Sequence, residues 1–343
     1  MIRVALIGCG AIARHSHIPA WKSIPQARLV ALCDQSLDTA QSLQKRFGLD
    51  CRLYENLEET LVTEKPDVLD ICTPGHLHFE HAFAGLSAGT NVLVEKPPVM
   101  SVEEADILLE LAESKQRKIG AVFNFRYYDV IQEAKKAIDA GLVGKVTKIH
   151  VIHHANNVYA ESPYLWDERR SKYLLYDFGI HFIDAMLFLG GPVEEILYVL
   201  PTQSEYSGET TDLLVVFRFE SGAIGTFEIT ADFTRHSSHQ TRIDICGTAM
   251  DMFVRRFPPS VRLAAGIQNP IDILFEEIKA DWRIASKILT RQYLRWRNIS
   301  HERVIGLYVD WLLGNAQYPM SLVDCMPTLR VLRDLEKAIP AYF

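Results

Sequence analysis

Short, nearly continuous apolar runs alternate with amphipathic stretches along the first third of the chain. The apolar runs are residues 2–7, 29–33, 67–72, 91–94 and 119–123. Runs of this kind are typical of strands that are buried on both faces of a parallel sheet. The stretches with helical spacing are residues 12–22, 37–47, 57–63, 79–88 and 101–115. The pattern therefore predicts an α/β domain with a doubly wound parallel sheet, a Rossmann fold, over residues 1–124.

The pattern changes near residue 125. Helices are expected at 130–140 and 177–189, with a strand at 145–154. Several strands then follow one another with only short turns between them, at 195–200, 212–220, 223–233, 241–246 and 250–255. Consecutive strands joined by turns such as Ser221-Gly222 form antiparallel hairpins. Residues 125–343 are thus expected to form a second α/β domain with a large, mainly antiparallel sheet.

A glycine-rich turn ends the first apolar run. Its sequence is Gly8-Cys9-Gly10-Ala11-Ile12-Ala13, and Asp34 ends the next run. Gly8 allows a tight turn, Gly10 lets the backbone approach a pyrophosphate, and Ala13 lets the following helix pack closely. The pyrophosphate would lie at that helix's N-terminus. An acid at the position of Asp34 binds the adenosine ribose and repels a 2′-phosphate, so NAD is favoured, with NADP possible.

Composition narrows the class of protein. The chain has 343 residues, 48% of them hydrophobic, and a net charge of −7. This length favours two domains, and the negative charge argues against nucleic acid as a partner. The six cysteines lack paired spacing, which favours reduced thiols and no metal site. With no leader or membrane segment expected, the sequence favours a cytoplasmic protein.

Four motifs together resemble the Gfo/Idh/MocA family, the glucose-fructose oxidoreductase and inositol dehydrogenase group. In order, they are Gly8 to Ala13, Thr73-Pro74 with His78, Glu95-Lys96-Pro97, and Asp177 to Asp184. The resemblance implies NAD(P)-dependent hydride transfer at a hydroxyl or carbonyl carbon of a sugar, an aminosugar or a polyol. It further implies a cis peptide bond between Lys96 and Pro97.

The resemblance also assigns site residues. The expected cofactor-binding residues are Gly8, Gly10, Ala11, Ile12, Ala13, Asp34, Thr73, Pro74, His78, Glu95 and Lys96. Hydride transfer to a carbonyl builds negative charge on oxygen, so a cation and a proton donor are needed nearby. Lys96 resembles the family's catalytic lysine and His181 its acid/base. Asp177 is expected to orient the substrate or these two partners.

Two other functions share these motifs. One is a glycosidase that retains its NAD and acts by transient oxidation and elimination, and the other is a non-catalytic NAD-binding regulator. Ser171-Lys172-Tyr173 replaces a run of glycines found in many family members, which leaves the substrate class open. The segment 271–298 has helical apolar spacing and several arginines. It could pack on the sheet or a subunit, lie on a membrane surface, or receive a phosphorylated ligand.

The second sheet suggests self-association. Along 212–220, Leu213, Val215, Phe217 and Phe219 form one apolar face, but Leu214 and Val216 make the opposite face partly apolar. An antiparallel sheet with a solvated face usually alternates more cleanly. We therefore expect a homodimer or homotetramer in which the sheet of another subunit covers this face.

Overall fold

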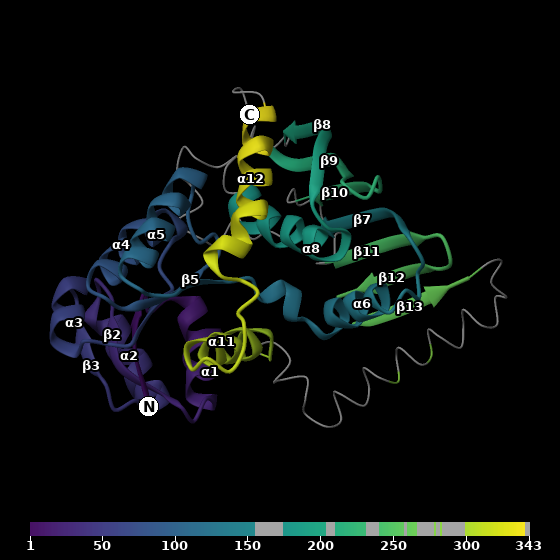
Figure 1. Ribbon diagram of the computed structural model, residues 1–343. Helices are drawn as coiled ribbons and strands as arrows, with labels where there is room; N and C mark the ends of the chain where they lie inside the picture. Colours follow the sequence, from purple (N-terminus) through teal and green to yellow (C-terminus); the bar gives the residue numbers. More distant parts are fainter. Residues whose placement is uncertain are drawn as a thin grey trace. The chain divides into compact units, whose positions relative to one another are not determined.

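The computed structural model describes residues 1–154, 174–203, 210–230, 240–256, 259–265, 278, 282 and 299–339 (Figure 1). The chain forms two compact units. The first contains Met1–Tyr127 and Arg295–Leu329, and the second contains Tyr128–Leu294 and Arg330–Phe343. Among the described residues, no helix is both long and apolar enough to span a membrane.

The first unit is built on a six-stranded parallel sheet with the strand order β3-β2-β1-β4-β5-β6. Its strands are β1 Ile2–Ile7, β2 Ala27–Cys33, β3 Arg52–Tyr54, β4 Val68–Ile71, β5 Asn91–Glu95 and β6 Ile119–Val122. The strands β4 and β6 are buried at every position, as continuous apolar runs require. The predicted doubly wound parallel sheet is confirmed; the short β3 is an additional edge strand.

Helices link successive strands of this sheet. They are α1 Ile18–Ser23, α2 Leu37–Phe47, α3 Leu57–Glu64, α4 His78–Ser87 and α5 Val102–Ser114. Ser101 caps α5 by accepting the Glu104 N–H, and the Glu104 carboxylate accepts the Met100 N–H. These two hydrogen bonds fix the start of α5. Because all six strands are parallel, their carboxyl ends lie at one edge of the sheet.

The C-terminal part of the chain returns to this unit. Helix α11, Ile299–Leu312, lies beside α1 although the two are far apart in sequence (Figure 1). Beyond it, the Ala121 N–H donates to the Met320 carbonyl at 2.9 Å, and the Tyr318 hydroxyl donates to the Ala121 carbonyl at 2.7 Å. This segment covers the edge strand β6, and α12, Leu322–Ala338, follows it.

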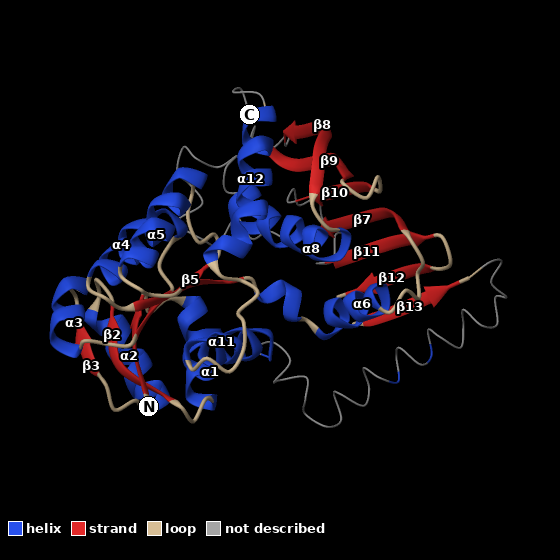
Figure 2. Cartoon of the chain, viewed as in Figure 1, coloured by secondary structure: helices blue, strands red, loops and turns tan. Residues whose placement is uncertain are grey.

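The second unit contains a seven-stranded sheet with the order β13-β12-β11-β7-β10-β9-β8 (Figure 2). Its strands are β7 Val146–His154, β8 Val193–Gln203, β9 Thr210–Phe219, β10 Ile224–Thr230, β11 Gln240–Gly247, β12 Asp251–Arg255 and β13 Ser260–Ala264. Only the β7–β10 pair is parallel among the pairs of this sheet that the structure describes. The predicted mainly antiparallel sheet is confirmed.

The two faces of this sheet differ. Leu213, Val215, Phe217 and Phe219 are at most 1% exposed. Helix α6, Asp129–Asp139, and helix α8, Ile180–Gly190, contact the sheet, and the ring of Phe182 on α8 lies 5.7 Å from that of Phe227 on β10. On the other face of β9, Asp212, Leu214 and Val216 are half-buried and Arg218 is exposed. The first face is therefore the core of the unit.

Candidate functional site

The glycine-rich turn fits a dinucleotide closely. Gly8 has φ +90°, and a Cβ there would lie 2.7 Å from backbone atoms of Cys72 and Thr73, so only glycine fits. A Cβ on Gly10 would meet nothing within 4 Å. The space beside Gly10 is thus open for a pyrophosphate, while Ala13 is fully buried.

Asp34 ties the end of β2 to this turn. One carboxylate oxygen accepts the Cys9 N–H at 2.7 Å, and the other accepts the Ser36 N–H at 2.9 Å. Each oxygen keeps a second lone pair that can accept from a ribose hydroxyl. The glycine turn and this acid fit NAD, whose adenosine ribose Asp34 would hold. When bound, NAD supplies the nicotinamide that accepts or donates a hydride.

His78 joins two further turns of the predicted cofactor site. Its Nδ1 lies 2.6 Å from the Pro97 carbonyl oxygen, and its Nε2 lies 2.7 Å from the Thr73 carbonyl oxygen. Burial acts to lower the pKa of His78, while the hydrogen bonds to the two carbonyl oxygens, each of which needs a ring N–H, act to raise it. The Lys96-Pro97 bond is cis, as the resemblance implies. His78 therefore holds the turn after β4 against the turn after β5.

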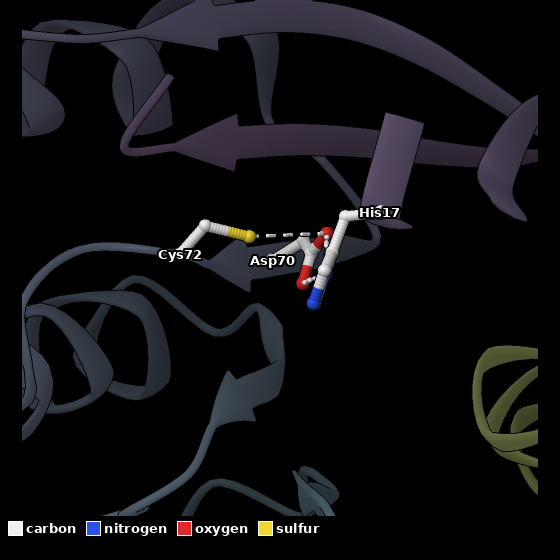
Figure 3. A group of neighbouring side chains, drawn as sticks. All are labelled: His17, Asp70 and Cys72. Carbon is white, nitrogen blue, oxygen red and sulfur yellow. Dashed lines mark hydrogen bonds and ion pairs between the residues drawn. The ribbon is translucent and has the colours of Figure 1, made fainter. Parts of the chain in front are cut away.

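Beneath these turns, His17 is held between two carboxylates. Its Nδ1 donates to Asp70 Oδ2 at 2.8 Å, and its Nε2 donates to Glu95 Oε1 at 2.8 Å. Trp21 Nε1 also donates to Asp70 Oδ2, at 2.7 Å. Figure 3 shows the ring of His17 beside Asp70, with Cys72 on the opposite side of that carboxylate. His17, Asp70, Glu95 and His301 are called the His17 cluster below.

The electrostatics of the His17 cluster follow from its burial. Burial acts to lower the pKa of His17, but the Asp70 carboxylate overcomes it and holds this pKa well above the usual range. Burial likewise acts to raise the pKa of Glu95, but hydrogen bonds from His17 and His301 bring it well below its usual value. His17 is therefore an imidazolium between two carboxylates at neutral pH.

The fourth member of the cluster comes from the C-terminal part of the chain. His301 Nε2 on α11 lies 3.3 Å from Glu95 Oε1. Asn124, at the end of β6, donates to the Ser300 hydroxyl at 3.3 Å, and its amide nitrogen lies 3.4 Å from His301 Nδ1. Burial lowers the pKa of His301, so this ring favours the neutral form. The acidic partner of His301 is thus Glu95, which lies far from it in the sequence.

A π-helical turn places His17 in this position. Residues Ala13–His17 form the turn directly after the glycine motif, and His17 is fully buried at its end. Such turns occur often at functional sites. Neither His17 nor Asp70 was predicted from the sequence. An isolated acid within the buried run Val68–Ile71 was the available signal, because a charge buried in a strand needs a partner.

The remaining predicted site residues lie in the second unit. Asp177 belongs to a π-helical turn, Leu174–Gly179, and His181 to the first turn of α8, so the segment is helical as predicted. Both side chains are half-buried. The ring of Phe182 lies 4.4 Å from that of His153, whose Nδ1 is 3.0 Å from the Thr241 hydroxyl. Aromatic packing therefore fixes the start of α8 against the sheet.

The remaining predicted features concern the start of the first helix, two segments of the second unit, the cysteines and Pro74. Ala11 is exposed and Ile12 half-buried at the start of the helix after the glycine turn. Residues 171–173 lie outside the described residues, and so does the segment 271–298 except Ile278 and Trp282, which are 53% and 72% exposed. All six cysteines lie among the described residues and none forms a disulfide; four are buried and two half-buried. Pro74 is the residue before a short 3₁₀ turn, Gly75–Leu77.

The parallel sheet, the glycine turn and Asp34 define a dinucleotide-binding oxidoreductase domain followed by a mixed-sheet domain. Residues 2–123 match the model of an oxidoreductase family with an NAD-binding Rossmann fold, and residues 131–252 match the GFO/IDH/MocA C-terminal domain. The chain belongs to the Gfo/Idh/MocA family, as the motifs indicated.

Relatives with named activities are similar to parts of the chain. D-glucoside 3-dehydrogenase of Escherichia coli is 30% identical over 192 residues, which are 55% of this chain and 54% of that enzyme. The chain thus spans about half the length of that relative. Myo-inositol 2-dehydrogenase of Thermotoga maritima is 26% identical over 259 residues, 74% of this chain and 75% of that enzyme.

Solved structures show the same fold. The WlbA dehydrogenase of Bordetella pertussis, in complex with NADH and UDP-GlcNAcA, has a TM-score of 0.81 and 21% identity. The match covers 98% of this chain and 95% of that chain. At this level of identity the similarity concerns the fold alone.

Proposed function

We propose that the protein is an NAD-dependent dehydrogenase that moves a hydride between the nicotinamide and a hydroxyl or carbonyl carbon of a sugar, an aminosugar or a polyol. The observation that carries this proposal is the glycine turn with Asp34, followed by Lys96 at the end of β5. In parallel sheets of this kind, ligands bind at the carboxyl ends of the strands. The similarity to named sugar and inositol dehydrogenases supports the substrate class.

Lys96 is proposed to supply the cation. When an alcohol is oxidised, its oxygen carries negative charge as the hydride leaves, and a fixed ammonium group lowers the free energy of that state. The turn that carries Lys96 is held by buried groups on both sides, Glu95 before it and His78 at Pro97. A cation held in this way needs little reorganisation during the reaction.

His181 is proposed to exchange the proton of the reacting hydroxyl. A neutral imidazole has a nitrogen lone pair that can take a proton near neutral pH. Asp177, four residues earlier in the same helical segment, is proposed to orient the substrate or His181. These roles follow the family motif, in which the same residue types have the same spacing.

A panel of sugars, aminosugars, polyols and nucleotide sugars tests the proposal. Each compound is mixed with enzyme and excess NAD, and formation of reduced nicotinamide is followed by its absorbance. We expect sustained NADH formation with at least one compound. Cofactor that stays bound with no net reduction, while a glycoside is cleaved, would instead identify a glycosidase that retains its NAD.

Two further features belong to this proposal. We propose a homodimer or homotetramer, because Leu214 and Val216 on the open face of the second sheet are only partly buried. We also propose a reducing compartment, the cytoplasm, because no described cysteine forms a disulfide and burial raises the pKa of Cys72 to about 12. A thiol with so high a pKa reacts slowly with oxidants.

A further inference from the structure

The His17 cluster contains the atoms of a metal site, but its distances indicate hydrogen bonds. His17, Glu95 and His301 each offer one ligand atom within a small buried space. Two ligands of one zinc ion, each bound at about 2.0–2.2 Å in a tetrahedron, lie about 3.3–3.6 Å apart. His17 Nε2 and Glu95 Oε1 are only 2.8 Å apart. Since both ring nitrogens of His17 already donate to carboxylates, neither has a lone pair for a metal.

Instead, Glu95 connects the His17 cluster to the turn that carries Lys96. Oxygen Oε1 of Glu95 accepts from His17, whereas oxygen Oε2 accepts the backbone N–H of Lys96 at 3.0 Å. Glu95 is only 5% exposed and His17 is fully buried. The Glu95 carboxylate can therefore hold the Lys96 N–H with Oε2 only while a donor at Oε1 fixes the orientation of the carboxylate.

The charges explain why a histidine is suited to this position. Two buried carboxylates, Asp70 and Glu95, would repel each other if no cation lay between them. The imidazolium of His17 donates to one carboxylate with each nitrogen and so orients both. A neutral side chain in its place would leave Glu95 with a full negative charge and without its charged partner, inside the protein.

We propose that His17 is a positioning residue for hydride transfer: it fixes the Glu95 carboxylate, which in turn fixes the Lys96 backbone at the end of β5. This inference rests on the proposed function, because it takes Lys96 as the cation of the reaction. His17 itself is buried and does not touch the substrate. Its effect is on the placement of Lys96.

The substitution His17→Gln tests the proposal because it removes the charge but keeps a hydrogen-bonding side chain. We expect the single-turnover rate of hydride transfer to fall about 10²-fold, as a displacement of about 1 Å can cause. The dissociation constant of NAD should change less than about threefold, because the glycine turn and Asp34 remain. The matched control is His15→Gln, an exposed histidine on the same helical segment, which should keep the normal rate.

The double variant His17→Gln/Glu95→Gln separates positioning from packing. With both charges removed, the two new amides can hydrogen-bond to each other, and the amide oxygen introduced at position 95 can still accept the Lys96 N–H. We expect the double variant to transfer hydride at least about tenfold faster than His17→Gln alone. If the double variant is as slow as the single variant, or if folded His17→Gln transfers hydride normally, the proposal is wrong.

Hydrogen exchange at the Lys96 amide gives a readout that does not depend on activity. Exchange of this N–H should be at least about tenfold faster in His17→Gln and return toward normal in the double variant, while the Gly8 N–H, bonded to the Cys33 carbonyl, stays unchanged. Unchanged exchange at Lys96 would refute the positioning role. A wild-type enzyme that reduces no NAD, with the exchange pattern as expected, would refute the proposed function alone.

Discussion

His17 Nε2 donates to Glu95 Oε1 across 2.8 Å, although 78 residues separate them in the sequence. The hydrogen bond joins the helix after the glycine turn to the strand that carries Lys96. One buried ion pair therefore connects two parts of the first unit. One part is expected to bind the cofactor, and the other is expected to act on the substrate. This pair has measurable consequences for stability.

The first prediction concerns stability and pH. The pKa of His17 is raised in the folded state. Its contribution to the free energy of unfolding is therefore complete below about pH 6.5 and is lost as the pH rises through the folded-state pKa. The pKa of Glu95 is lowered, so its contribution is complete above about pH 4.5 and is lost as the pH falls through the folded value. Asp70, Cys72 and His301 also face the ring of His17.

Thermal unfolding of His17→Gln measures this contribution. Breaking a buried pair by removing one partner costs about 3–5 kcal/mol, so the variant should melt well below the wild type near pH 6. The difference should shrink as the pH rises into the alkaline range, where wild-type His17 loses its proton. A difference that stays constant across that range would mean that His17 is neutral in the folded protein.

The second prediction concerns the choice of cofactor. We expect Asp34 to hold the adenosine ribose, where its carboxylate would repel a 2′-phosphate, so NAD should bind more tightly than NADP. Asp34→Asn should lower the ratio of the NADP dissociation constant to the NAD dissociation constant at least about tenfold, because it removes the negative charge that repels the 2′-phosphate. Titrations at several salt concentrations measure the ratio. Asp106→Asn, which removes an exposed charge from α5, is the control and should leave the preference intact.

The third prediction concerns the catalytic pair. His181→Ala should slow single-turnover hydride transfer about 10²–10⁴-fold, the usual effect of losing a general acid or base. Lys96→Ala should slow it at least as much, while both variants still bind NAD. The control His150→Ala removes a histidine that lies 2.6 Å from the Thr226 hydroxyl on the second sheet, and should transfer hydride normally. Near-normal transfer by His181→Ala across neutral pH would assign the proton exchange to another residue.

The fourth prediction concerns self-association. Val216→Lys places a charge on the partly buried face of β9, which we expect another subunit to cover. Light scattering should give a dimer or tetramer for the wild type and a smaller species for this variant. Val62→Lys, at a position 72% exposed on α3, should not change the mass. A wild-type mass of 39.0 kDa at all working concentrations would contradict the prediction.

The local pattern of the chain was sufficient to predict most of the fold. The continuous apolar runs identified β1, β2, β4, β5 and β6, and the turn at Gly222 marked a hairpin of the second sheet. These features depend on residues close together in sequence. The cofactor turn was predictable for the same reason, since Gly8 and Gly10 act through their own backbone.

The His17 cluster could not be predicted in this way. Its members lie on segments far apart in the chain, and His301 reaches Glu95 only because α11 returns to the first unit. Neither α11 nor the short β3 and β13 had a distinct sequence pattern. Asp70 was the single local indication, an acid between apolar neighbours in a buried strand.

Transfer of deuterium tests the central claim most directly. The enzyme is mixed with an equal amount of NAD and with sugars, aminosugars and polyols that carry deuterium on their hydroxyl-bearing carbons, and the released cofactor is analysed by mass spectrometry. The proposed function predicts reduced nicotinamide that carries one deuterium, in an amount that approaches one per subunit, with at least one compound. Released NAD that is neither reduced nor labelled with any compound would contradict it.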